Sequence, residues 1–188
     1  MFDKAEIEKA VTSIIKAIGD DPNREGLRGT PERVADMYAE LFNGTDMDPK
    51  GELSVDFEEG HREMVIIRDI PFYSMCEHHL LPFYGVAHIG YIPNERGRVV
   101  GASKLARVVE IVARRPQIQE RMTTQIVNAI VEGIHPDGAG VVIHAEHLCM
   151  IMRGIKKPGS TIQTSALRGS FRSKPTTRAE FMSLLQCR

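Results

Sequence analysis

The sequence of 188 residues has few cysteines, no long apolar run and almost no net charge, and each absence excludes a class of protein. Its three cysteines, Cys76, Cys149 and Cys187, do not form a disulfide framework. We therefore expect a reducing, cytoplasmic setting in which thiols stay free or bind metal. No run reaches the roughly 18 apolar residues of a membrane span. The N-terminus mixes acids with bases and lacks a cleavage-site pattern, which excludes a secretory signal.

The net charge of −1 argues against a nucleic-acid partner, because proteins that bind nucleic acids are normally clearly basic. Positive charge is instead gathered in two short stretches, RRP at Arg114–Pro116 and MRGIKKPG at Met152–Gly159. Local basic clusters on a nearly neutral protein suit a small anionic ligand. The alternative for any single side chain is a solvated surface.

The pattern along the chain changes from helices to strands. Residues 6–18 carry the apolar stripe of an amphipathic helix, and a second helix is predicted after Thr30 as its N-cap. The turn-rich stretch NGTDMDPKGELS follows. We therefore predict a helical arm and connector over residues 1–60 and a separate, strand-rich core over residues 61–188.

Within the core, short β-branched runs alternate with helical stripes. EMVIIRDIPF and YGVAHIGYIP predict two strands that end at proline, and residues 103–113 and about 117–134 predict two helices. AGVVIHAEHLCMIMRGI and STIQTSALRG predict further strands, and residues 177–186 a closing helix. Strands, then two helices, then more strands favour an α+β fold with an antiparallel sheet.

The stretch SMCEHHLLPF places Cys76 and His79 in C-x-x-H spacing, close enough for a turn to direct both at one metal ion. Cys149, in AEHLCMIMR, adds a third candidate ligand. Three protein ligands with one open position are typical of catalytic metal sites, whereas structural sites usually have four. The alternative is that Cys149 is a small buried hydrophobic residue and the histidines have ordinary core or surface roles.

The same stretch contains a second histidine, His78. On an extended backbone adjacent side chains point to opposite sides, so His78 and His79 cannot easily bind one ion. His78 is then free for proton transfer near neutral pH or for orienting the site. If Cys149 lies on a strand, His147 and Arg153 share its face. A metal-activated water flanked by two histidines is suited to hydrolysis.

Several long motifs together resemble the zinc-dependent class of GTP cyclohydrolase I. They are SMCEHHLLPF, GASKLARVVEIVARRPQIQERMT, AEHLCMIMRGI and TSALRGSF, with EGLRGTPERVADMY similar to the family's N-terminal region. The resemblance implies the T-fold, an antiparallel sheet with two helices packed on one face. It also implies that subunits assemble into a toroidal decamer with active sites between them. The implied reaction converts GTP and water into 7,8-dihydroneopterin triphosphate and formate, at the start of pteridine and tetrahydrofolate synthesis.

The resemblance also implies roles for individual residues. The implied zinc ligands are Cys76, His79 and Cys149. The implied proton-transfer histidines are His78 and His147. Guanine recognition falls on Gln119 and Glu120. A carboxylate there can accept two hydrogen bonds from guanine donors that adenine lacks. The alternative for this pair is the solvated first turn of a helix.

The implied contacts to the triphosphate form a third set. They fall on Ser103, Lys104, Arg107, Arg153 and Arg33. Ser103 is the predicted N-cap of its helix, and a helix N-terminus with a lysine beside it favours anions. Some family members carry a lysine three positions after the residue that corresponds to Arg33, whereas this chain has Asp36. That difference puts a phosphate role for this helix in question.

Two other classes of function compete with this interpretation. One is a related T-fold enzyme that stops at a cyclic phosphate, uses iron or reduces a nitrile. The retained ligand triad and both histidines count against the nitrile-reducing branch. The other is a non-catalytic module stabilised by zinc, which would need a fourth protein ligand and would be indifferent to GTP.

Overall fold

The computed structural model describes residues 2–54 and 56–186, and the chain divides into two compact units, Met1–Asn43 and Gly44–Arg188. The first unit consists mainly of two helices that pack on each other, α1 (Lys4–Ala17) and α2 (Thr30–Leu41). Across the described part of the chain, no helix combines the length and the apolar character needed to cross a bilayer.

The start of each helix in the first unit follows from local capping. The side chain of Asp3 accepts a hydrogen bond from the backbone N–H of Glu6 at 3.0 Å and so caps α1. The predicted N-cap of α2 is wrong by one position, because the cap is Gly29 and Thr30 is already helical. Pro31 suits the first turn, where its missing N–H leaves no hydrogen bond unmade.

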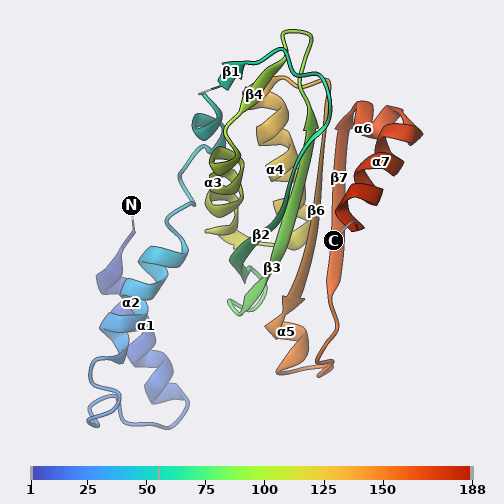
Figure 1. Ribbon diagram of the computed structural model, residues 1–188. Coiled ribbons are helices and arrows are strands. Elements are labelled where there is room, and N and C mark those ends of the chain that lie inside the picture. Colours follow the sequence, from blue (N-terminus) through green and yellow to red (C-terminus); the bar gives the residue numbers. More distant parts are fainter. Residues whose placement is uncertain (1, 55, 187–188) are drawn as a thin grey trace. The chain divides into compact units, whose positions relative to one another are not determined.

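The second unit is built on a five-stranded sheet with the order β5-β2-β3-β6-β7 (Figure 1). These strands are β2 (Val65–Cys76), β3 (Pro82–Ile92), β5 (Pro116–Gln117), β6 (Gly138–His147) and β7 (Ile162–Gly169). The four long strands are antiparallel, and the short β5 runs parallel to the end of β2. A separate pair joins β1 (Asp56–Glu58) to β4 (Arg98–Val100), preceded by the short 3-10 helix η1 (Pro49–Leu53).

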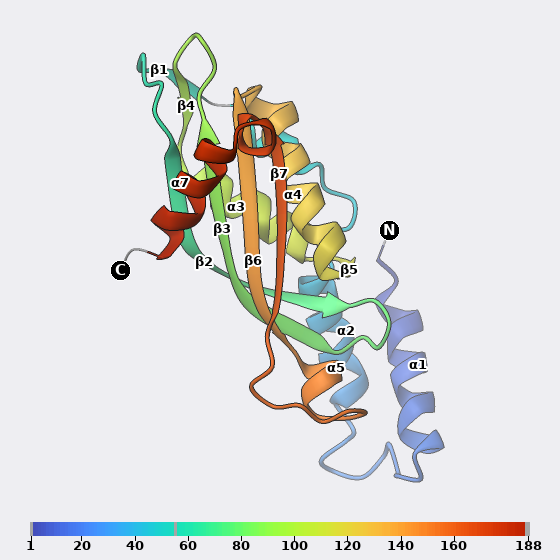
Figure 2. The ribbon, with the colours of Figure 1, turned by 90° about the vertical axis from the view of Figure 1, so that its right-hand side faces the viewer.

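Helices cover both faces of this sheet (Figure 2). One face packs against α3 (Ala102–Ala113) and α4 (Gln119–Ile134), and the other against α6 (Ser170–Ser173) and α7 (Pro175–Gln186). The predicted α+β class, with an antiparallel sheet and two helices on one face, is confirmed. This is the arrangement expected for the T-fold.

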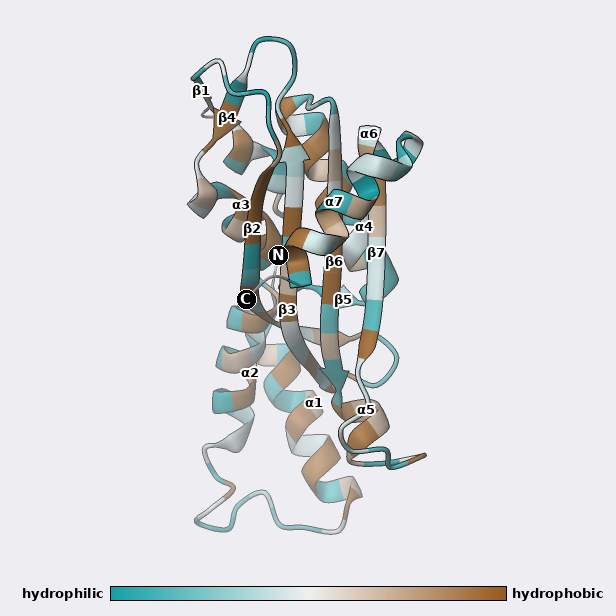
Figure 3. Ribbon diagram, turned by 45° about the vertical axis from the view of Figure 1, so that its right-hand side comes forward, coloured by the Kyte–Doolittle hydropathy of each residue, from teal (hydrophilic) through white to brown (hydrophobic). Residues whose placement is uncertain are grey.

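The main core lies between the sheet and the pair α3 and α4. Strand residues alternate between faces, so every second residue of β3 and β6 points into this core. Its fully buried members include Ile89, Tyr91, Val141 and Ile143 from the strands and Val108, Met122, Ile126 and Ile130 from the helices. In Figure 3 the strands carry long hydrophobic stretches, whereas the connection between β3 and β4 is hydrophilic.

Two paired glycines make room for the helices on the opposite face. Gly90 of β3 pairs with Gly140 of β6, and the rings of Phe171 and Phe181 pack directly over them. A Cβ atom on Gly90 would lie 2.6 Å from the ring of Phe181, which is too close for any side chain. Both glycines are therefore needed for α6 and α7 to approach the sheet.

Two local expectations differ from the structure at the ends of elements. Helix α3 begins at Ala102 with Gly101 as its cap, so Ser103 lies inside the first turn and is not the N-cap. Strand β6 ends at His147, and Cys149 lies on the short helix α5 (Leu148–Ile151). The alternation that would place His147 and Cys149 on one strand face therefore does not apply.

Candidate active site

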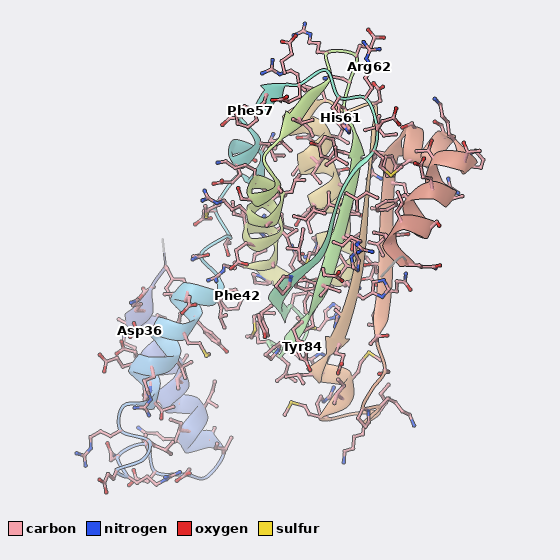
Figure 4. All side chains as sticks on the ribbon, viewed as in Figure 1. Asp36, Phe42, Phe57, His61, Arg62 and Tyr84 are labelled. Carbon is pink, nitrogen blue, oxygen red and sulfur yellow. The ribbon has the colours of Figure 1, made fainter. Side chains whose placement is uncertain are left out.

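The chemically distinctive residues gather at one end of the sheet. There β2 ends, β3 begins, β6 ends and α4 begins, with α5 beside them (Figure 1). Tyr84, labelled in Figure 4, lies near this end of β3, and its ring packs against that of Tyr73 with centroids 5.9 Å apart. The candidate site residues therefore come from segments that the sheet register brings together.

A tight turn between β2 and β3 holds the first two candidate ligands. The backbone N–H of Cys76 donates to Leu81 at 2.9 Å, and the backbone N–H of Leu80 donates to Cys76 at 2.8 Å. Leu80 has a φ of +50°, which a bulky side chain rarely adopts. Because this backbone is a turn, the premise that His78 and His79 lie on an extended segment is wrong. Their rings are nevertheless nearly perpendicular, at 87°.

Cys76, His79 and Cys149 come together as a possible metal site. One ligand atom from each residue lies within 4.8 Å of the others. The Sγ of Cys76 is 3.9 Å from Nδ1 of His79. Ligand atoms at zinc-like bond lengths around a tetrahedral ion are roughly 3.3–3.8 Å apart. Two thiols and an imidazole at this spacing therefore fit one ion after a small adjustment, and they are the donors that zinc prefers.

Burial affects the protonation of this group. Burial is the largest cause that raises the pKa of the Cys149 thiol, and the neighbouring Cys76 raises that pKa further.

Arg153 lies on the solvent side of this group, with its Nη1 atom 3.2 Å from Nε2 of His79. The structure thus brings one predicted phosphate contact, Arg153, directly beside the candidate metal ligands.

His147 lies next to this group in a confined position. Its side chain is buried, and its ring stacks on Phe83 with centroids 4.5 Å apart and an interplanar angle of 4°. Its Nε2 atom is 2.8 Å from Oε1 of Gln119. Burial lowers the pKa of His147, while the charge of Glu120 opposes that shift. The predicted proton-transfer histidine, the last residue of β6, therefore lies against Gln119, the first residue of α4.

The two residues predicted to recognise guanine differ sharply in environment. Glu120 is exposed in the first turn of α4. Gln119 is buried, and its amide nitrogen lies within hydrogen-bonding distance of the backbone oxygens of Ile143 and Ile162 and of Thr164 Oγ1. Glu120 can therefore reach a ligand, whereas the side chain of Gln119 is already bonded within the protein.

An ion pair that the sequence reasoning missed joins the turn to α4. Glu77 accepts two hydrogen bonds from the guanidinium of Arg121, at 2.5 and 2.9 Å. Arg121 holds the pKa of the Glu77 carboxyl below its usual value. His78 is close by, with its Nε2 atom 3.8 Å from Glu77. The sequence gives only a weak signal for this ion pair: Glu77 lies inside the motif CEHH, and Arg121 directly follows Gln119 and Glu120.

The other predicted phosphate contacts lie elsewhere. Ser103, Lys104 and Arg107 are in the N-terminal half of α3. The opposite end of that helix lies beside the metal-site end of β2, because the hydroxyl of Ser74 donates to the backbone oxygen of Ala113 at 2.7 Å. At about 1.5 Å per residue, Lys104 is roughly 14 Å along the helix from that end. A single chain therefore does not bring Lys104 and Arg107 next to Cys76.

The same two cations already have a carboxylate partner. Oε2 of Glu52 in η1 is 3.3 Å from Nζ of Lys104 and 3.4 Å from Nη1 of Arg107. The hydrogen bond from Lys104 is the largest cause that lowers the pKa of Glu52, and Arg107 adds to it. Any phosphate bound here would compete with Glu52.

Arg33 and Asp36 lie on α2 in the first unit. Arg33 donates to the hydroxyl of Thr30 at 2.9 Å, and Asp36 forms an ion pair with Lys4 at 2.7 Å. Asp36 therefore carries a structural ion pair at the position where some family members have a lysine.

A cavity also exists on the opposite face of the sheet, away from the candidate metal site. It has a volume of about 560 Å³ and lies between the sheet and α7. Its lining includes Arg68, Asp69, His88 and His144. Cys76, His79, Cys149 and His147 are not among its lining residues and lie at the end of the sheet.

Comparison with known proteins bears on this site. The family model described as GTP cyclohydrolase I matches residues 7–186. GTP cyclohydrolase 1 of Dehalococcoides mccartyi is 68% identical over 186 residues, covering 99% of this chain and 98% of that protein. The enzyme of the same name from Thermoanaerobacter pseudethanolicus is 57% identical, with 98% of each chain covered. That of Geobacillus kaustophilus is 59% identical, covering 97% of this chain and 96% of that protein.

Proposed function

Because this chain belongs to the GTP cyclohydrolase I family, we propose that it is a hydrolase that opens the guanine imidazole ring of GTP. The products are formate and 7,8-dihydroneopterin triphosphate, and the reaction begins tetrahydrofolate synthesis. The observation that carries this proposal is the meeting of Cys76, His79 and Cys149 beside the buried His147.

We propose zinc as the metal, held by Cys76, His79 and Cys149. Two thiols and one imidazole suit zinc, and three protein ligands leave a position open for chemistry. When bound, the ion would supply Lewis-acid chemistry that makes water a better nucleophile near neutral pH. Glu77 and the turn hydrogen bonds keep the first two ligands in place around the end of β2.

Proton transfer is assigned to His78 and His147. Opening the ring and releasing formate break both bonds from C8 to the ring nitrogens N7 and N9. A proton must leave the attacking water, and protons must reach the two nitrogens as they separate from C8. Imidazoles can both accept and donate protons near neutral pH. His78 is exposed and can exchange protons with solvent, whereas His147 is buried and fixed against Phe83. The two histidines are therefore suited to different proton-transfer steps.

Guanine recognition is assigned mainly to Glu120. Its exposed carboxylate can accept hydrogen bonds from N1–H and the 2-amino group of guanine, which adenine cannot offer together. The predicted guanine contact of Gln119 concerns a residue whose side-chain amide already has partners within the protein. In this proposal Glu120 accounts for the preference for guanine.

Triphosphate binding is assigned to Ser103, Lys104, Arg107 and Arg153, with Arg33 as a further candidate. Arg153 lies beside the metal ligands, but Lys104 lies near the far end of α3. We therefore propose that a complete site combines the metal end of one copy with α3 of another. This requirement supports the toroidal homodecamer implied by the sequence resemblance, with active sites between subunits.

The proposed enzyme has a catalytic core over residues 61–188 and an arm with its connector over residues 1–60. A cytoplasmic location remains a prediction from the small number of cysteines. Neither a nucleic acid nor a membrane is expected as a partner.

The direct test is incubation of the purified, zinc-loaded protein with GTP. We expect 7,8-dihydroneopterin triphosphate by mass spectrometry and one formate per GTP consumed. ATP serves as the control substrate and should remain unchanged. Recovery of intact GTP from a folded, zinc-replete oligomer would contradict the proposed activity.

A further inference from the structure

We propose that Gln119 is a positioning residue for His147. Its side-chain amide holds the neutral imidazole in the tautomer that carries its proton on Nε2 and leaves Nδ1 with the lone pair. The consequence for catalysis rests on the proposed function, whereas the position of the proton can be measured independently of it.

The orientation of the Gln119 amide follows from two carbonyl groups. One terminal atom of this side chain lies 3.2 Å from the backbone oxygen of Ile143 and 3.0 Å from that of Ile162. Carbonyl oxygens only accept hydrogen bonds, so the atom facing them must be the NH₂ nitrogen. The reverse orientation would place an amide oxygen against two other oxygens in a buried position.

The neighbouring hydroxyl groups agree with this orientation. Oγ1 of Thr123 donates to the backbone oxygen of Gln119 at 2.7 Å, which uses its only proton. In the 2.6 Å contact between Thr123 and Thr164, Thr164 must therefore be the donor. Having donated its proton, Thr164 can only accept from the amide nitrogen of Gln119, at 3.1 Å.

The amide oxygen of Gln119 consequently faces His147. This oxygen can only accept, so Nε2 of His147, at 2.8 Å, must carry a proton. A neutral imidazole has one N–H, so Nδ1 has the lone pair. The exposed fractions of Gln119, Thr123 and His147 are 2%, 1% and 8%, so water has little access to replace these partners. Stacking on Phe83 also fixes the plane of the ring.

The network leaves the Gln119 side chain with little capacity to bind a substrate. Its two N–H groups have three acceptors, and its oxygen is occupied by His147. Within the described residues, no hydrogen bond reaches Nδ1 of His147, which is therefore the nitrogen available for proton transfer. Loss of the Gln119 amide should therefore affect turnover more than GTP binding.

Solid-state ¹⁵N NMR of the zinc-loaded protein with labelled histidine tests the position of the proton. Solid-state spectra do not require a small assembly, and the signal of His147 is assigned by its loss in His147→Ala. We expect wild-type His147 to show a single tautomer with Nε2–H. Gln119→Met should show a mixture with a substantial Nδ1–H fraction. A wild-type spectrum with Nδ1–H, or identical spectra for the two proteins, would overturn the proposal.

Kinetics separate positioning from guanine recognition. For Gln119→Met we expect kcat to fall by about 100-fold and the KM for GTP to change by less than about threefold. Gln119→Leu also removes the acceptor for His147 and should show the same tautomer mixture and the same loss of kcat, which provides a second variant if the methionine protein folds poorly. Gln125→Met, on the same helix but bonded to Gln117, is the matched control and should stay near wild type.

An increased KM with unchanged kcat in Gln119→Met would instead make Gln119 a guanine contact and overturn the positioning role. A wild-type protein that does not convert GTP would contradict the proposed function alone. The NMR result would still decide the tautomer in that case, so the two failures are distinguishable.

Discussion

The carboxylate of Glu77 forms a two-point ion pair with the guanidinium of Arg121, and this pair joins the turn that carries Cys76 and His79 to the first turn of α4. Gln119 and Glu120 begin that helix. The ion pair thus connects the turn with the candidate metal ligands to the helix that carries the candidate guanine contact. Neither segment could form this connection alone.

Replacing Arg121 with Gln should loosen this link. We expect kcat/KM for GTP to fall by about 10- to 100-fold, because small displacements of reacting groups are costly. The Glu77→Gln, Arg121→Gln double variant should be no worse than the single one, since both changes remove the same interaction. Arg24→Gln, which breaks a similar two-point pair with Asp20, is the control and should leave activity unchanged. Equal activity of the Arg121 variant and wild type would show that the Glu77–Arg121 ion pair does not contribute to the site.

Replacing Cys149 with Ser should abolish stable metal binding. A serine hydroxyl is a much poorer zinc ligand than a thiolate, so we expect less than one-tenth of the wild-type zinc content and a loss of activity of more than about 100-fold. Metal analysis measures the first effect, and circular dichroism should show a retained fold. Cys187→Ser, at the cysteine without an assigned role, is the control. Full zinc content in Cys149→Ser would exclude Cys149 as a ligand.

Replacing Glu120 with Gln should weaken the selection of guanine. An amide cannot accept two hydrogen bonds from guanine as a carboxylate does, so we expect kcat/KM for GTP to fall by about 10- to 100-fold with an unchanged melting temperature. Glu132→Gln lies at the other end of α4, where Glu132 pairs with Lys50, and provides the control. Unchanged kinetics in Glu120→Gln would show that Glu120 is a solvated surface residue and not a guanine contact.

Replacing Glu52 with Gln should strengthen GTP binding. Glu52 neutralises Lys104 and Arg107, so the amide would leave both cations available to the triphosphate. We expect the KM for GTP to fall roughly threefold at low salt, and the difference from wild type to shrink at high salt, where surface charges are screened. An unchanged KM at low salt would argue that these cations do not contact the substrate.

The buried His88 should make stability depend on pH. Burial lowers its pKa, and His144 and Arg68 lower it further while Asp69 opposes the shift. The unfolded chain therefore takes up a proton at a higher pH than the folded chain. The contribution of the neutral His88 to the free energy of unfolding is fully present above the ordinary histidine pKa of about 6.5. That contribution is lost as the pH falls below this value toward the lower pKa of the folded state.

The melting temperatures at pH 7.5 and at pH 5.5 test this expectation. We expect the wild type to melt lower at pH 5.5 and His88→Gln to show a smaller difference between the two conditions. His61→Gln changes an exposed histidine, labelled in Figure 4, and should keep the wild-type difference. Wild-type behaviour of His88→Gln would assign the pH dependence to other groups.

Local patterns in the sequence predicted much of the fold. Apolar stripes at helical spacing predicted the two helices that cover one face of the sheet, and these are confirmed as α3 and α4. Boundaries were less accurate, because Gly101 rather than Ser103 caps α3 and β6 gives way to α5 before Cys149. Such ends depend on the local competition between backbone hydrogen bonds and caps, which residue patterns resolve only approximately.

The sequence by itself determined the family, the fold class and the three candidate ligands, because these depend on residue types at short, regular spacings. Only the tertiary structure decided that the amide of Gln119 faces His147, that Glu77 pairs with Arg121, and that Lys104 lies far from Cys76 along α3. These relationships join segments far apart in the chain. They follow from strand register and helix packing, which place side chains together only once the whole sheet has formed.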